Sequence, residues 1–458
     1  MFKKLVISLG SIVLIVFLSA AYYFSPVLNA GSGFSAKNIC SGHFLSGLSG
    51  QVIVEEALEP ASEILANISF DIDEGNRQVD TSLFGFFHRR AVYSEGTGCT
   101  LLSADNQQLQ RRVDVADPGK PAGELPWPQG TAPVPGNTEL QAVLKQAFAE
   151  TDSVHERNTK AVVVIHNGQL VAEKYAPGID ASTPLIGWSM TKSVTNLLVG
   201  LLVHDGRLAL EQAAPVPLWH LDADDPRGAI TMDQLMRMSS GLVFDEEYGL
   251  YSDVTRMLSV EADAAGFAAS KPLLTEPDRL WAYSSGTSNI ISGIIKRTVG
   301  GSFQDYFNFP QQRLFLPLGI HSAAIETDDN GTFIGSSFMY ASAHDWARLG
   351  QFCLQGGQWQ GEQLLPENWL SYSTTPTPNN PLNNYGAHFW LNADPDDSQQ
   401  QRSWPSLPAD TFSMNGYQGQ RVVIVPSKDL VVVRLGFSAG SKRGIEQLVA
   451  GVIEVLAP

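Results

Sequence analysis

Residue types that build metal and redox centres are scarce in this sequence. Its 458 residues include three cysteines and nine histidines, and no Cys-x-x-Cys pair or His-Glu-x-x-His pattern occurs. The histidines are scattered singly, whereas a protein metal site needs several ligands at short, regular spacings. The sequence therefore predicts no metal site and no organic cofactor.

Clusters of basic residues are also absent. Lys and Arg total 30 against 47 Asp and Glu, which gives a formal net charge of −17. A surface of this sign repels a phosphate backbone, so no nucleic-acid partner is predicted and the acidity is attributed to solubility. With 43% hydrophobic side chains, the chain can bury a large core, which favours one elaborated catalytic domain with an appendage.

One long uncharged run lies at the N-terminus. Residues 5–24 follow Lys3 and Lys4, and as a helix they would span about 30 Å. Residues 1–30 are therefore interpreted as a signal peptide or a membrane anchor, and both interpretations stay open. Either one predicts export, with the rest of the chain in the periplasm or anchored in the inner membrane and facing the periplasm.

A small β-rich module is predicted over residues 31–116. Short apolar and polar runs alternate at 81–87, 90–93 and 99–102, as in strands. In an oxidising compartment, Cys40 and Cys99 could form a disulfide that stabilises this module, whereas Cys353 lies in an apolar stretch and is interpreted as a buried small hydrophobe. Residues 117–135 are rich in Pro and Gly and indicate a linker to a main domain at 136–458.

The main domain combines strands from both of its ends. Residues 161–165 and 170–175 form a predicted hairpin around an Asn-Gly turn, and residues 421–425 and 430–435 form a second antiparallel pair. Helices are expected over 137–149 and from about 442 to 456, and the chain between about 204 and 380 is mainly helical. This order predicts an α+β fold with one sheet and an inserted helical subdomain.

The candidate nucleophile is Ser189, which precedes a predicted helix over residues 191–203. Lys192 follows it by three residues, and residues at this spacing share one face of a helix. The hydroxyl would lie among unpaired backbone N–H groups, with an amine one turn away that can help to activate it. Because Ser-x-x-Lys occurs by chance in most chains of this length, it indicates little without further motifs.

Two further segments follow in a characteristic order. Residues 280–286 contain Tyr283-Ser284-Ser285-Gly286, and residues 415–421 lead directly into a predicted strand. With Ser189 and Lys192, they resemble the serine β-lactamase-like superfamily, which includes class C β-lactamases, D,D-peptidases, related esterases and 6-aminohexanoate-dimer hydrolases. The resemblance covers roughly residues 135–458. It implies a β-lactamase/transpeptidase-like fold, in which helices flank an antiparallel sheet.

The resemblance also implies catalytic roles. Ser189 would be acylated, Lys192 would assist its deprotonation, and Tyr283 would act as general base and acid, with Ser285 at the third place of Tyr-x-Ser. The chemistry of these side chains agrees, because serine is a weak nucleophile that needs an adjacent base. Tyrosine has an ordinary pKa near 10 and can serve as that base only if a cation such as Lys192 stabilises its phenolate.

The third segment is similar to the Lys-Thr-Gly or His-Thr-Gly strand motif of the family, here matched to Tyr417-Gln418-Gly419. The resemblance implies that Gly419 lets the backbone approach the substrate. It also implies that the backbone N–H groups of Gln420 and Ser189 form the oxyanion hole.

Two departures from the family pattern bear on the substrate. Ser285 stands where true β-lactamases have Asn, and Tyr417 stands where they have a cationic Lys that helps to hold the β-lactam carboxylate. Arg421 is interpreted either as a compensating charge or as an exposed residue. The departures shift the prediction from β-lactams to small esters or linear amides.

The sequence therefore predicts an exported serine hydrolase that cleaves small-molecule esters or linear amides through an acyl-Ser189 intermediate. The alternatives are a penicillin-binding sensor, a D,D-peptidase or β-lactamase acting on cell-wall-like or β-lactam substrates, and a catalytically silent scaffold. An α/β-hydrolase is disfavoured, because residues 187–191 lack the second glycine of Gly-x-Ser-x-Gly.

Overall fold

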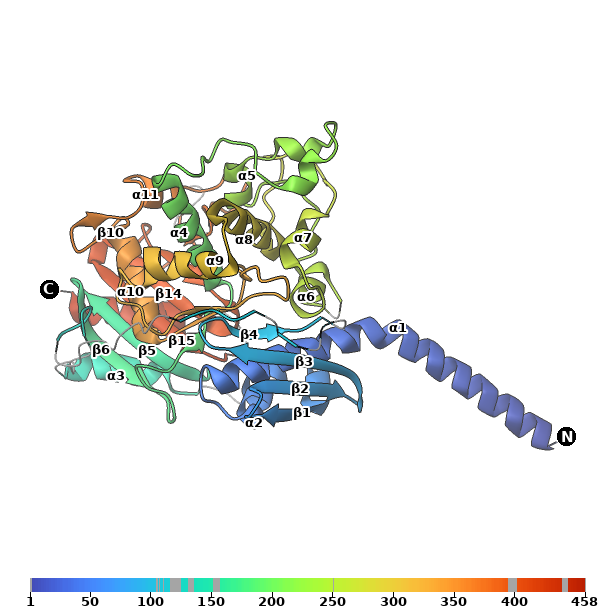
Figure 1. Cartoon of the computed structure of the whole chain (residues 1–458). Coiled ribbons are helices and arrows are strands. Elements are labelled where there is room, and N and C mark those ends of the chain that lie inside the picture. The colour runs from blue at the N-terminus through green and yellow to red at the C-terminus, as the bar shows by residue number, and fades with distance from the viewer. Residues whose placement is uncertain are drawn as a thin grey trace.

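The computed structural model describes residues 2–103, 106, 108–109, 111–115, 125–130, 136–150, 157–249, 251–393, 402–438 and 444–457, with side chains from residue 23 onward. Figure 1 shows a largely helical part above a central sheet, with a smaller sheet beside it. The N-terminal end of helix α1 (Phe2–Phe44) projects away from this body (Figure 1).

The main sheet confirms the predicted α+β class. It has six antiparallel strands in the order β12 (Trp390–Leu391), β13 (Phe412–Asn415), β14 (Arg421–Val425), β15 (Leu430–Gly436), β5 (Thr159–His166) and β6 (Gln169–Tyr175). Both predicted strand pairs are present, and β15 joins them by pairing with β5. The first and last parts of the main domain therefore meet in one sheet.

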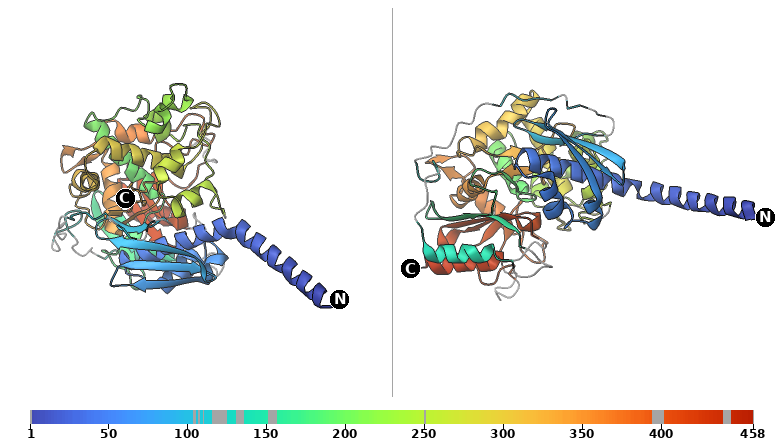
Figure 2. Two further views of the ribbon diagram at one scale, coloured as in Figure 1. Left: turned by 45° about the vertical axis from the view of Figure 1, so that its right-hand side comes forward. Right: turned by 90° about the horizontal axis from the view of Figure 1, so that it is seen from below.

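Both faces of this sheet are buried, which explains why its central strands are apolar at nearly every position. Val163 and Val433 face the core that contains α10 (Ala343–Leu354), whereas Val162 and Val432 face the core of α3 (Thr138–Ala147) and α12 (Ile445–Leu456). Successive strand residues point to opposite faces, so a strand covered on both sides needs apolar residues throughout. Figure 2 shows α3 and α12 side by side against the sheet.

The chain between β6 and β12 forms the predicted helical insertion. A short sheet of β7 (Leu185–Ile186), β9 (Met339–Ala341) and β8 (Ala324–Ile325) and a hairpin of β10 (Gln358–Trp359) and β11 (Glu362–Gln363) interrupt it. Its helices, apart from α10, are α4 (Met190–His204), α5 (Met232–Met236), α6 (Asp253–Ser259), α7 (Ala264–Ala269), α8 (Ser285–Val299), α9 (Phe303–Pro310) and α11 (Trp369–Ser373).

The N-terminal module is a four-stranded antiparallel meander that packs against α1. Its strands are β1 (Ile68–Asp73), β2 (Gln78–Leu83), β3 (Phe86–Ser94) and β4 (Gly98–Leu101), and α2 (Gly50–Ile53) follows α1. The strand predicted over 81–87 is in fact divided, because Phe84 and Gly85 both adopt positive φ in a turn. The periodicity of the sequence also missed β1.

Two predicted segments lie partly outside the described residues. In the segment 1–30, residue 1 and the side chains of residues 2–22 lie outside the described part. The backbone of α1 continues through residue 30 without a break. In the fully described part of the chain, no helix is long and apolar enough to cross a membrane. Of the predicted linker 117–135, residues 125–130 are described, and Trp127 is buried against α10, where Arg348 donates two hydrogen bonds to the Pro128 carbonyl.

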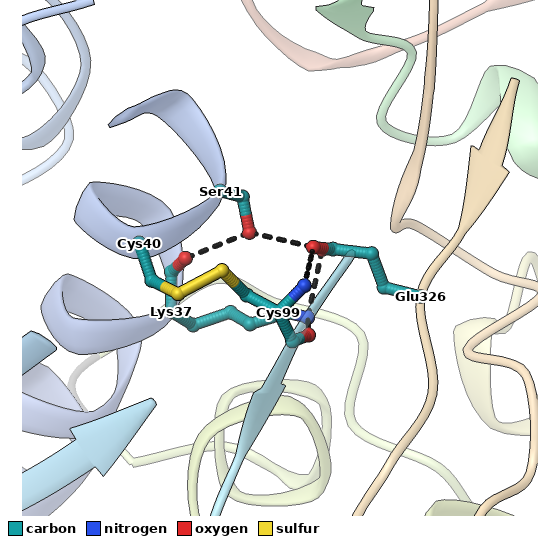
Figure 3. Close-up of a disulfide and its surroundings, with 5 residues drawn as sticks. All are labelled: Lys37, Cys40, Ser41, Cys99 and Glu326. Carbon is teal, nitrogen blue, oxygen red and sulfur yellow. Dashed lines mark hydrogen bonds and ion pairs between the residues drawn. A yellow bond between two sulfur atoms is a disulfide. The ribbon is translucent and has the colours of Figure 1, made fainter. Parts of the chain in front are cut away.

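The module is fastened to the main domain by buried polar contacts. Cys40 of α1 and Cys99 of β4 form a disulfide, with 6.1 Å between their Cα atoms (Figure 3). Beside it, Lys37 Nζ lies 2.7 Å from Glu326 Oε2, and both side chains are almost fully buried. Glu326 Oε1 also accepts hydrogen bonds from the Ser41 hydroxyl at 2.8 Å and the Cys99 N–H at 2.6 Å. Glu326 precedes β9 in the helical insertion, so the two parts form one structural unit.

Candidate active site

Ser189 lies at the start of α4, as predicted. The chain reaches it through Trp188, which has an unusual positive φ of 47° and is buried. A bulky residue holds this conformation only when its surroundings fix it, and the Trp188 ring packs at 6.0 Å from Phe34 and 5.6 Å from Phe338. These contacts hold the sharp turn that presents Ser189 at the end of the helix.

Lys192 lies one turn further along α4 and contacts the serine. Its Nζ is 3.2 Å from Ser189 Oγ, 3.0 Å from Ser285 Oγ and 3.0 Å from the Ser336 carbonyl oxygen. The side chain is 1% exposed. Burial lowers the pKa of Lys192 to about 8, against the opposing effect of the nearby Glu246 carboxylate. More of this amine is therefore neutral near physiological pH than in an ordinary lysine, and the neutral form can accept a proton.

Tyr283 is brought to the same place from the loop before α8. Its ring centroid lies 4.7 Å from Lys192 Nζ, and the rings of Tyr385 and Trp390 surround it at 5.6 and 5.5 Å. Burial, followed by Tyr385 and Glu246, raises the pKa of Tyr283 well above its ordinary value, although a hydrogen bond with Ser189 opposes this. The resting site thus favours neutral tyrosine over the phenolate that the sequence argument required.

Ser285 is the first residue of α8 and lies beside Ser189, Lys192 and Tyr283, which together with it are called the catalytic cluster. It connects Lys192 to Glu246, a residue that the sequence did not indicate. Glu246 Oε1 accepts a hydrogen bond from the Ser285 hydroxyl at 2.5 Å, and Glu246 Oε2 accepts one from the Ser285 N–H at 2.6 Å. Burial raises the pKa of Glu246, and the charge of Lys192 opposes the rise. Glu246 lies in an irregular loop with no motif around it, so only the fold could reveal it.

The segment between β13 and β14 contains two glycines, Gly416 and Gly419, and the structure shows which of them lies close to the backbone beside Ser189. Gly419 has a φ of 82°, and a Cβ added there would meet Arg434 Nη1 at 2.5 Å, so its Cα faces Arg434. A Cβ added at Gly416 would lie only 2.1 Å from the Gly187 carbonyl oxygen, two residues before Ser189. The close contact with the backbone beside Ser189 is therefore made by Gly416, directly after β13, and the predicted Gly419 lies three residues later in the turn at Tyr417–Gly419.

Gln420 is likewise placed differently from the prediction. Its N–H points to the Tyr417 carbonyl at 3.4 Å, and its buried side chain pairs with the backbone of Gly436 on β15. Its backbone N–H is therefore engaged within the turn.

Arg421 is buried at the start of β14, which excludes the interpretation as an exposed residue. Its Nη1 donates hydrogen bonds to the carbonyl oxygens of Gly416 at 2.8 Å and Gln420 at 2.7 Å. Burial lowers the pKa of Arg421 to about 10, and the proximity of Tyr283 opposes this shift. Its guanidinium therefore braces the backbone turn that carries Tyr417.

Tyr417 provides an aromatic wall where the resemblance would place a cation. Its ring meets Trp188 edge-on at 5.8 Å and stacks on Tyr248 at 6.2 Å with parallel planes. Burial of the hydroxyl raises the pKa of Tyr248, and hydrogen bonding with Ser285 and Ser337 opposes that rise. Tyr248 had no signal in the sequence; it stacks on Tyr417 and lies two residues after Glu246.

In this geometry, a lysine on the helix that begins at Ser189 contacts the serine hydroxyl, an arrangement that can activate a serine as a nucleophile. The chain belongs to the Beta-lactamase family, whose model matches residues 144–446. The predicted resemblance to the serine β-lactamase-like superfamily is thereby confirmed, and it supports a serine hydrolase of the amide or ester type.

Individual relatives are distant. A 6-aminohexanoate-dimer hydrolase of Paenarthrobacter ureafaciens is 22% identical over 298 residues, covering 62% of this chain and 73% of the relative. The structure of EstA from Arthrobacter nitroguajacolicus has a TM-score of 0.52 at 20% identity, covering 71% of this chain and 97% of EstA. A penicillin-binding protein homolog from Caulobacter crescentus has a TM-score of 0.52 at 17% identity, covering 71% and 99%. At these identities the two structures confirm the fold.

Proposed function

We propose that the protein hydrolyses esters or linear amides through an acyl-Ser189 intermediate. The observation that carries this proposal is the 3.2 Å contact between Ser189 Oγ and the buried Lys192 Nζ. Neutral Lys192 accepts the hydroxyl proton as Oγ attacks the substrate carbonyl carbon. Lys192, directly or through Tyr283, passes this proton to the departing alcohol or amine. Water then attacks the acyl carbonyl carbon and gives a proton to neutral Lys192; the bond to Ser189 Oγ breaks, Oγ takes this proton back, and the carboxylic acid is released.

The oxyanion that forms during attack needs preorganised N–H donors. The proposed donors are the backbone N–H groups of Ser189 and Tyr417, since neither bonds to an acceptor within the described part of the chain. The close approach of Gly416 to the Gly187 carbonyl supports this pairing. Such a donor typically contributes about 10²- to 10³-fold in rate.

A substrate panel tests the reaction class. We expect p-nitrophenyl esters or short linear amides to show an acyl-enzyme burst followed by steady turnover, and a chromogenic cephalosporin to react poorly because Tyr417 replaces the cation. Intact-mass measurement would show one acyl group per chain during turnover. A single stoichiometric labelling without turnover would contradict the proposal and favour a penicillin-binding sensor; efficient cephalosporin hydrolysis would favour the β-lactamase or D,D-peptidase alternative.

The rate is expected to depend on pH through Lys192. Only the neutral amine accepts the serine proton, so kcat/KM for an ester should rise as pH increases through about 8, the lowered pKa of Lys192. Stopped-flow or steady-state rates from pH 6 to 10 measure this limb. Glu246→Gln removes a charge that raises the pKa of Lys192, so the limb should move to lower pH. A limb that stays in place in this variant would contradict the assignment.

Export is proposed as well. Lys3 and Lys4 followed by the apolar residues 5–24, together with the Cys40–Cys99 disulfide, support an oxidising location outside the cytoplasm. Fractionation of a bacterial host that produces the full chain measures this. Recovery in the cytosol with both cysteines reduced would contradict export.

A further inference from the structure

An apolar pocket of about 280 Å³ lies where the N-terminal module meets the main domain. The module contributes Leu28 and Phe34 from α1 and Leu65 from the segment before β1. The main domain contributes the aromatic rings of Trp188, Tyr248 and Tyr417. The module's part of the wall lies outside residues 144–446, so the family match does not account for it.

This pocket borders the catalytic cluster. Trp188 directly precedes Ser189, Tyr417 directly follows Gly416, and Tyr248 lies two residues after Glu246, whose carboxylate accepts hydrogen bonds from Ser285. Phe34 of the module stacks on Trp188, with 6.0 Å between ring centroids and 15° between planes. A group covalently attached to Ser189 can therefore extend along the aromatic rings toward α1.

The positions of Lys192 and Tyr283, the proton donors, indicate where the leaving group and the acyl part of a substrate would lie. The leaving group must receive a proton from Lys192 or Tyr283, so it faces those side chains. Neither of them lines the apolar pocket. The acyl part extends from the same carbonyl carbon in another direction, where the aromatic wall begins. We propose that the pocket binds the acyl chain and that the substrates are esters or amides of medium-length apolar carboxylic acids.

The chemistry of the walls narrows this class. Among the described residues, no charged side chain lines the pocket, so a charged group on the acyl chain would lose its hydration without gaining a partner. A volume near 280 Å³ equals about nine water molecules at roughly 30 Å³ each, which suits a chain of about eight carbons. Each methylene buried there would improve kcat/KM by up to about fourfold.

The inference rests on the proposed acyl-Ser189 reaction and is tested with the full chain, because residues 27–34 of α1 form part of the wall. p-Nitrophenyl acetate, butyrate and octanoate share one leaving group and vary only the acyl chain. We expect kcat/KM to rise by at least about tenfold from acetate to octanoate, as several methylenes become buried.

Two variants test the location. Ala61 is exposed at the pocket wall, and Ala61→Trp would fill it; Ile64→Asp would place a charge in the same wall. Each should lower the ratio of octanoate to acetate kcat/KM by about tenfold, corresponding to the loss of roughly two buried methylenes. The matched control is Ala142→Trp, on the exposed surface of α3, which should leave the ratio unchanged.

The outcomes separate the two proposals. Acetate turnover without any dependence on acyl length, or a ratio unchanged in both wall variants, would overturn the acyl-chain assignment while the serine mechanism stands. Rates that instead follow the size of the alcohol in a series of acetate esters would assign the pocket to the leaving group and also overturn it. Failure to hydrolyse any ester or linear amide would overturn the proposed function itself.

Discussion

Ser189→Ala is expected to lower the turnover of a p-nitrophenyl ester by at least about 10⁴-fold. The substitution removes the hydroxyl that carries the acyl group in the proposed mechanism, whereas Lys192, Ser285 and Glu246 keep their mutual contacts. Alanine is also acceptable at this helix start, so the fold should be retained. Initial rates at a fixed enzyme concentration, together with intact-mass detection of the acyl group, measure the effect.

The control for this variant is Ser371→Ala, which removes an exposed hydroxyl on α11 and should leave the rate unchanged. Circular dichroism of both variants checks that the fold is intact. Ester turnover that is undiminished in the Ser189 variant would refute an acyl-Ser189 mechanism, whatever the substrate class.

Glu326→Ala is expected to lower the free energy of unfolding by about 3–5 kcal/mol. The variant would leave Lys37 buried without its counter-charge, and it would also remove the acceptor of the Ser41 hydroxyl and the Cys99 N–H (Figure 3). Burial already lowers the pKa of Lys37 and raises that of Glu326, so each charge depends on the other. Urea denaturation followed by tryptophan fluorescence measures the loss.

Two further variants show whether the loss of stability comes from the buried charge of Lys37. The double variant Lys37→Met/Glu326→Leu replaces the ion pair by apolar side chains and should recover much of the lost stability, since no charge is left buried alone. Glu276→Ala breaks an exposed pair with Arg279 and should cost less than about 1 kcal/mol. A loss in Glu326→Ala as small as that in Glu276→Ala would show that the buried pair does not hold the module in place.

The approach of Gly416 to the Gly187 carbonyl shows why the candidate site could be predicted only in part. Ser189 and Lys192 were found because a helix fixes the geometry of residues three apart. The resemblance matched Gly419 to the glycine of the strand motif, but the spacing of residues along a turn does not show which Cα lies against a distant part of the backbone. Only the approach of Gly416 to the Gly187 carbonyl distinguishes the two glycines.

Glu246 and Tyr248 illustrate a second limit. They lie in an irregular loop, where the backbone has no period that relates one residue to the next, so no pattern could place them beside Ser285. The same holds for the lysine and glutamate between the module and the main domain: Lys37 and Glu326 are 289 positions apart and had no signal as a pair.

The sequence by itself determined the four strands β5, β6, β14 and β15 of the main sheet, the helix that follows Ser189 and the family, because apolar runs, helical spacing and motif order are local properties of the chain. The tertiary structure decided what surrounds Ser189: the protonation of Lys192 and Tyr283, the carboxylate of Glu246, the position of the close backbone approach, and the apolar pocket shared with the N-terminal module. Desolvation and contact depend on which distant segments pack together, and that packing is set by the whole fold.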